Sequence, residues 1–167
     1  MKLKRKLCGI FASMSGLMIL LSLILPFFKS IESSGNSSGN YGLFNKYEEF
    51  DTRFKALNDL FEPAFAHMVS VICIMAIILY GVFVLLFFFQ VIKFGAVAYR
   101  PILRAVSLVL IILGVCALAS GITFTVMNRV VFNSRVILSF RMGGGLYMLS
   151  IGALLAGVLG FIGEARY

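Results

Sequence analysis

Four long runs of apolar residues, none of which contains an Asp or Glu, dominate this chain of 167 residues. The runs cover residues 7–28, 67–92, 102–126 and 144–163. Each is long enough for a helix to cross a bilayer, which takes about 20 residues. The runs predict an all-α fold, namely a four-helix transmembrane bundle. It would form a single integral membrane domain over residues 1–167, with outer loops at residues 29–66 and 127–143.

The composition leaves no room for a separate soluble domain, because 60% of the residues are hydrophobic and the mean hydropathy is +1.01. The first run follows a basic head and is longer than the apolar part of a signal peptide, which spans about 7–15 residues. We therefore expect it to be retained as the first span.

The distribution of charge predicts the topology. The net charge is +8, but the basic residues flank the runs instead of lining one groove, which favours a lipid bilayer over nucleic acid as the partner. Lys2, Lys4, Arg5 and Lys6 should hold the N-terminus in the cytoplasm. Four spans return the C-terminus to the same side. The sequence thus predicts a multi-pass protein of the plasma membrane.

The first outer loop is predicted to contain an amphipathic helix at residues 44–61. Its apolar residues recur at steps of three or four: Phe44, Tyr47, Phe50, Phe54, Leu57, Leu60 and Phe61. Glu48, Glu49 and Asp51 belong to its polar face. Such a helix would lie on the membrane, cover the outer mouth of the bundle, or dock a partner.

Residues 33–40 precede this helix and consist only of Ser, Gly and Asn. This composition is typical of a flexible linker. Asn36 also begins a glycosylation sequon, which only a eukaryotic secretory route would use. The sequence leaves open whether Asn36 is glycosylated.

The second outer loop, residues 127–142, is unusually apolar and fits either a short hairpin or a helical extension of the third span. It carries Arg129, Arg135 and Arg141 without an acidic neighbour. We expect these arginines to pair with the acidic residues of the first outer loop. Lipid headgroups and an anionic partner are the alternatives. Together with Phe44, Tyr47, Glu48, Glu49, Asp51 and Phe54, they form the predicted interaction surface.

Small residues predict which spans pack closely, because they let helix backbones approach one another in lipid. The fourth span is richest in them, with Gly145, Gly152, Ala156 and Gly160 as the candidate packing positions. We expect the first, third and fourth spans to pack closely and the second to be more peripheral.

No residue pattern points to catalysis, a cofactor or a metal. His67 is the only histidine, and Cys8, Cys73 and Cys116 are too scattered to supply metal ligands. The runs lack the acidic or His relay that is typical of pumps and transporters. We therefore predict no catalytic, cofactor-binding or metal-binding residue.

The segment Arg141-Met142-Gly143-Gly144-Gly145-Leu146-Tyr147 resembles the start of the fourth span in claudin-type tetraspan proteins. The layout of two outer loops, with the first one longer, is also similar. The first-loop signature of that family contains a Gly-Leu-Trp stretch followed by two Cys. Here only Gly42-Leu43-Phe44 matches in part, because the chain has no Trp and the loop has no Cys. The resemblance is therefore one of layout.

These observations predict a non-enzymatic multi-pass membrane protein. It would act as an accessory, assembly or interaction subunit through its extracytoplasmic surface. Its partner would be another membrane protein or a second copy of the chain. The alternative is an oligomeric channel or transporter subunit that assembles through the Gly-rich fourth span.

Overall fold

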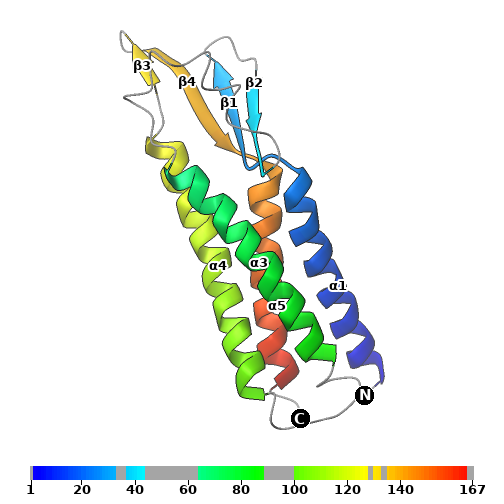
Figure 1. Cartoon of the computed structure of the whole chain (residues 1–167). Helices are drawn as coiled ribbons and strands as arrows, with labels where there is room; N and C mark the ends of the chain where they lie inside the picture. Colours follow the sequence, from blue (N-terminus) through cyan, green and yellow to red (C-terminus); the bar gives the residue numbers. More distant parts are fainter. Residues whose placement is uncertain are drawn as a thin grey trace.

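The computed structural model describes residues 2–32, 37–43, 64–88, 100–127, 130–132 and 135–164. Four long helices lie side by side, and a β-sheet stands at one end of them (Figure 1). The chain termini both lie at the opposite end. We call the two ends of the bundle the sheet end and the terminal end.

The helices are α1 (Lys2–Ile24), α3 (Ala64–Phe88), α4 (Arg100–Met127) and α5 (Gly144–Glu164). Three of them contain stretches long and apolar enough to cross a membrane: His67–Leu86, Pro101–Met127 and Gly144–Ile162. The apolar part of α1, Ile10–Ile24, is shorter. The chain is therefore an integral multi-pass membrane protein with four helices, three of which are long apolar spans packed together.

The predicted runs match α3, α4 and α5 closely, but the first run extends too far. Helix α1 ends at Ile24, and Phe28 begins a β-strand. Pro26 explains the difference, since a proline disfavours helical geometry in the residue before it. Hydropathy alone did not reveal this boundary, because Phe27 and Phe28 are as apolar as the helix.

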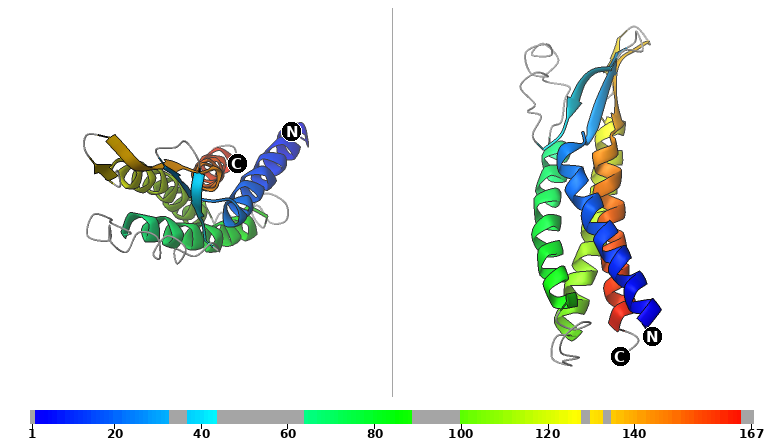
Figure 2. Two further views of the ribbon diagram at one scale, coloured as in Figure 1. Left: turned by 90° about the horizontal axis from the view of Figure 1, so that it is seen from above. Right: turned by 90° about the vertical axis from the view of Figure 1, so that its right-hand side faces the viewer.

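Helix α5 lies between α1 and α4 and packs against both, whereas α3 packs mainly against α4 (Figure 2). The share of buried residues in the apolar spans is 22% for α3, 39% for α4 and 56% for α5. Helix α3 is thus the most peripheral of the three, as expected. Helices α1 and α4 both contact α5, on different sides.

The sheet has four antiparallel strands in the order β2-β1-β4-β3. The strands are β1 (Phe28–Glu32), β2 (Ser37–Tyr41), β3 (Val130–Phe132) and β4 (Arg135–Met142). The central pair joins distant parts of the sequence, from Phe28 opposite Met142 to Glu32 opposite Leu138. Both segments that connect helices at this end therefore contribute to one sheet.

The sheet was only partly expected. Strands β3 and β4 correspond to the hairpin alternative for residues 127–142, but β1 and β2 were not predicted. The prediction of a flexible linker is wrong for residues 37–40, which belong to β2. The hydrogen bonds of a ladder join backbone groups, so Ser, Gly and Asn can take part once a neighbouring strand is fixed.

Candidate functional site

The sheet is fixed to the bundle where the end of α1 meets the start of α5. The Gly143 N–H donates to the carbonyl of Phe27 at 2.6 Å, and the Gly145 N–H donates to the carbonyl of Pro26 at 3.0 Å. The first N–H groups of a helix have no partner within it, so the second bond satisfies one of these groups in α5. We call residues 25–27 and 143–145 the α1–α5 junction.

Two of the three glycines at this junction have no room for a side chain. A Cβ at residue 143 would overlap the Pro26 carbonyl oxygen and lie 2.9 Å from its carbon. A Cβ at residue 145 would overlap the Leu25 carbonyl oxygen and lie 3.1 Å from the Phe27 ring. At residue 144 the nearest atom would be a Leu25 methyl at 3.7 Å, which is an ordinary contact. The junction thus requires glycine at residues 143 and 145.

An aromatic cluster connects the sheet to α4 beside this junction. The ring centroids of Phe28 (β1) and Phe124 (α4) are 4.3 Å apart, and those of Phe124 and Phe140 (β4) are 5.1 Å apart with an edge-on geometry. All three side chains are buried. Val69 of α3 belongs to the same core, so α3 and α4 both hold this face of the sheet. We call the face that carries Phe28 and Phe140 the aromatic face.

The opposite face carries two cations in adjacent strands. Lys29 of β1 pairs with Arg141 of β4 in the register of the sheet, and both side chains are exposed. Successive residues of a strand point to opposite faces, which puts both residues on the face turned away from Phe28 and Phe140. Neither cation forms an ion pair with another residue in the described part of the chain. We call Lys29 and Arg141 the cation pair.

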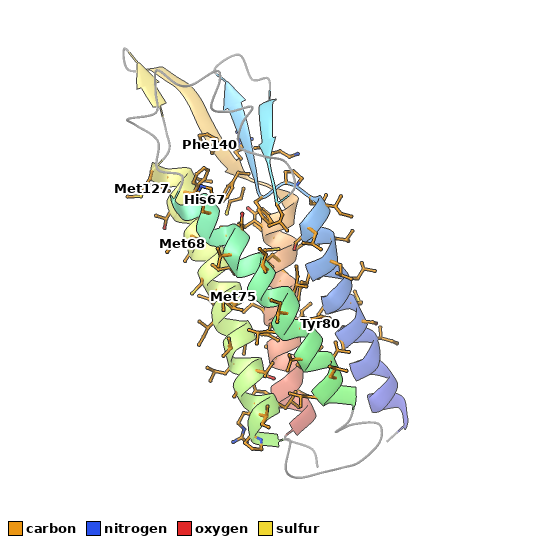
Figure 3. All side chains as sticks on the ribbon, viewed as in Figure 1. His67, Met68, Met75, Tyr80, Met127 and Phe140 are labelled. Atoms are coloured by element: carbon orange, nitrogen blue, oxygen red, sulfur yellow. The ribbon has the colours of Figure 1, made fainter. Side chains whose placement is uncertain are left out.

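The other predicted surface residues are only partly placed by the structure. Arg135 lies in β4 with Arg141. The remaining members lie outside the described residues: Phe44, Tyr47, Glu48, Glu49, Asp51, Phe54 and Arg129. His67 lies in the first turns of α3 at the sheet end, where it is exposed (Figure 3). The predicted amphipathic helix at residues 44–61 also falls outside the described ranges.

The predicted small residues of α5 contact two different helices. A Cβ at Gly152 would lie 2.9 Å from the Ser15 carbonyl oxygen of α1. A Cβ at Gly160 would overlap the Ser107 hydroxyl of α4. Ala156 is fully buried in a core that also contains Phe83 of α3. Together with Gly145 at the junction, these residues lie within the chain's own bundle.

Sequence reasoning missed a repeat in α4 that faces α5. Ser107, Gly114 and Gly121 are spaced by seven residues, and each lies against α5. A Cβ at Gly114 would lie 3.0 Å from the Ser150 carbonyl oxygen, and one at Gly121 would clash with Leu146. A period of seven keeps one side of a helix on its neighbour, as in a left-handed coiled coil. That spacing was the available signal.

The interior of the bundle is almost entirely apolar. The buried polar side chains of its described residues are Ser15, Ser22, Ser107 and Ser150. Three of them donate to carbonyls of their own helix at 2.6–2.7 Å. No group of three or more His, Cys, Asp or Glu side chains that could hold a metal occurs in the described ranges.

Two polar contacts join α1 to α3 across this interior. The Tyr80 hydroxyl donates to the Ala12 carbonyl, with the tyrosine between the two helices (Figure 3). The hydroxyl of Ser22 lies 3.5 Å from the sulfur of Cys73. Cys73 is buried beside this serine, whereas Cys116 is exposed on α4.

Fold and site together define a multi-pass integral membrane protein whose bundle carries a small antiparallel sheet at one end. In comparisons with protein-family models and with curated proteins, nothing matches the chain. Its function must therefore be argued from its own residues.

Proposed function

We propose that this chain is a four-span, non-enzymatic protein of the plasma membrane. It acts as an accessory, assembly or interaction subunit, and its sheet end is the extracytoplasmic contact surface. The observation that carries this proposal is the sheet itself. Both connecting segments at that end form one sheet, which the aromatic cluster and the α1–α5 junction fix to the bundle. Such anchoring gives a binding surface a defined shape before a partner arrives.

The length and packing of α1 support its role as a membrane span in addition to α3, α4 and α5. Its 23 residues correspond to about 34 Å of helix, compared with about 30 Å for the hydrocarbon core. It lies along α5, and both chain ends lie at the terminal end of the bundle. The basic residues before Leu7 then hold that end in the cytoplasm.

The content of the bundle interior supports a non-enzymatic role. Acid–base, nucleophilic and ion-coupled chemistry in a membrane uses ionisable residues that face the bundle interior. In the described residues that interior holds serines, Cys73, the Tyr80 hydroxyl and closely packed apolar side chains, but no buried Asp, Glu, His, Lys or Arg. A contact function needs no such group.

The channel alternative depended on glycines of the fourth span as contacts between copies. Gly145 lies against residues 25–27 of the α1–α5 junction, Gly152 lies against α1, and Gly157 and Gly160 lie against α4, all within one chain. These positions are therefore not free to join copies in the way that this alternative requires. We prefer the interaction subunit for this reason.

Purification in mild detergent, followed by mass spectrometry, tests the proposed function. The wild type is compared with a variant in which Arg129→Glu and Arg135→Glu reverse charge at the sheet end. Arg166→Glu, near the proposed cytoplasmic C-terminus, is the control for altered charge. We expect a stoichiometric membrane-protein partner that the double variant loses and the control retains.

Two results would count against the proposal. One is a partner that the double variant and the control retain equally. The other is a homo-oligomer without a partner that conducts ions in liposomes, which would favour the channel. Topology is tested separately, by adding a membrane-impermeant thiol reagent to intact cells that carry single cysteines at residues 38 and 166. Only residue 38 should react.

A further inference from the structure

We propose that Lys29 and Arg141 together bind the phosphate of an anionic phospholipid in the leaflet beside the sheet. The inference deepens the proposed function and rests on the four-span arrangement, because it names the partner of one face of the sheet. It concerns the cation pair, whereas Arg129 and Arg135 remain candidates for contacts with protein.

The register of the sheet brings the two charges close together. Residues directly opposite in an antiparallel pair have Cβ atoms about 4.5–5.5 Å apart, and like charges in such a position repel. No ion pair with a side chain that the structure describes neutralises either one. An anion between them would remove the repulsion, and a phosphate has enough oxygens to accept hydrogen bonds from both.

The distance of the pair from the apolar spans corresponds to the headgroup layer. Arg141 precedes the apolar span Gly144–Ile162 by three residues, which is about 10 Å of strand. Lys29 follows the end of α1 by five residues. The headgroup region on each side of the hydrocarbon core is about 5–8 Å thick. Long cationic side chains reach back toward that layer, so phosphates lie within their range.

The face of the sheet also favours lipid over the acidic segment of the same chain. Leu43, which follows β2, packs against the core that contains Phe28 and Val69, so it lies toward the aromatic face. Helix α3 begins on that side as well. Figure 2 shows β4 above α4 and α5, on the side of the bundle away from α3. The cation pair therefore lies on the opposite face of the sheet from Leu43 and Val69.

A fluorescent reporter can measure which lipid lies beside the cation pair. The chain contains no Trp, so a single introduced Trp gives a signal without background. Tyr147→Trp reports at the sheet end of α5, and Ile162→Trp reports at its terminal end. Both positions are exposed, at 43% each. The protein is reconstituted in phosphatidylcholine vesicles that contain brominated phosphatidylglycerol or brominated phosphatidylcholine. Quenching by brominated phosphatidylglycerol, divided by quenching by brominated phosphatidylcholine, gives the local preference for the anionic lipid.

We expect a preference for phosphatidylglycerol at residue 147 that Lys29→Gln or Arg141→Gln lowers about fivefold. This factor corresponds to about 1 kcal/mol for one basic residue at an anionic surface. Because both cations bind one phosphate, the double variant should lose less than the product of the two single losses. Lys29→Arg should keep the preference. The preference at residue 162 should not change in any of these variants.

Four results would overturn the proposal. The first is an unchanged preference for phosphatidylglycerol at residue 147 in the double variant. The second is an equal change in this preference at residues 147 and 162. The third is loss of the preference in excess inorganic phosphate, which would make free phosphate the ligand. The fourth is a rise in the preference when Glu48→Gln, Glu49→Gln and Asp51→Asn are combined, which would show that these carboxylates occupy the pair. If brominated phosphatidylcholine quenches neither reporter, the four-span arrangement itself is wrong.

Discussion

The Tyr80 hydroxyl of α3 donates a hydrogen bond to the Ala12 carbonyl of α1, and it does so within the apolar part of the bundle. The Ser15 hydroxyl donates to the same carbonyl at 2.7 Å. A Cβ at Gly16 would lie 2.6 Å from carbons of the Tyr80 ring, so a glycine makes room for the tyrosine. Helices α1 and α3 have a limited contact, and this bond is one of two polar contacts described between them.

Removal of the hydroxyl in Tyr80→Phe should lower the free energy of unfolding by about 1 kcal/mol, the scale of a hydrogen bond between membrane helices. The loss is limited because the Ala12 carbonyl keeps Ser15 as a donor. Circular dichroism during titration with sodium dodecyl sulfate measures the change. Tyr147→Phe, on the exposed side of α5, is the matched control and should behave as the wild type. Equal losses in both variants would contradict the role assigned to Tyr80.

The three glycines of the α1–α5 junction make a graded series. Gly143→Ala and Gly145→Ala should each destabilise the fold by about 1–3 kcal/mol, since the new methyl group overlaps the backbone of α1. Gly144→Ala should have little effect, because its methyl group has room. Unfolding can be followed on heating with a thiol-reactive dye that labels the buried Cys73, after Cys8 and Cys116 are replaced by Ala. The prediction fails if Gly144→Ala is as damaging as its neighbours.

Gly152 and Gly81 differ only in their surroundings. Gly152→Ala should separate α5 from α1 and lower the stability by about 1–3 kcal/mol, because its Cβ meets the Ser15 carbonyl and Ile19. Gly81→Ala meets nothing within 4 Å and should leave the stability unchanged or raise it, since alanine favours the helix. The same thiol assay compares them. A loss at Gly81 of the size seen at Gly152 would mean that helix geometry, not contact with α1, determines the effect.

Phe124 should be essential to the attachment of the sheet. Phe124→Ala removes the ring that contacts both Phe28 and Phe140, and should cost about 3–5 kcal/mol. Hydrogen exchange should then accelerate at the amides of β1 and β4 more than in α5. Phe11→Ala serves as the control, because Phe11 is 45% exposed on α1. Uniform acceleration over the whole chain would indicate general unfolding and not loss of this attachment.

The sequence was sufficient to locate α3, α4 and α5, because the length of an apolar run and the thickness of a bilayer depend on the same physical limit. It did not reveal β1 and β2. Phe28 reads as part of a span, and residues 37–40 read as a linker, since their strand is stabilised by backbone bonds to a neighbour. A hairpin at residues 127–142 was one of two alternatives, because its apolar residues suit both.

The candidate site was harder to predict from the sequence, for a related reason. Gly145 and Gly152 stood out by composition, but the need for glycine at residue 143 follows from the position of Pro26, which only the fold provides. The nearness of Lys29 to Arg141 likewise depends on the pairing of β1 with β4. No local pattern encodes the register of two strands so distant in sequence.

The α1–α5 junction also has a consequence for biosynthesis. With α1 as the first span, its main neighbour is synthesised much later, because α1 ends at Ile24 and α5 begins at Gly144. At about 5–20 residues per second, synthesis of the intervening chain takes on the order of ten seconds. Until then the backbone at Ser15 lacks the close contact that Gly152 of α5 makes with it. Contact between α1 and α5 can therefore form only after residues 25–143 have been synthesised, and a truncation before Gly143 leaves α1 without its principal contact.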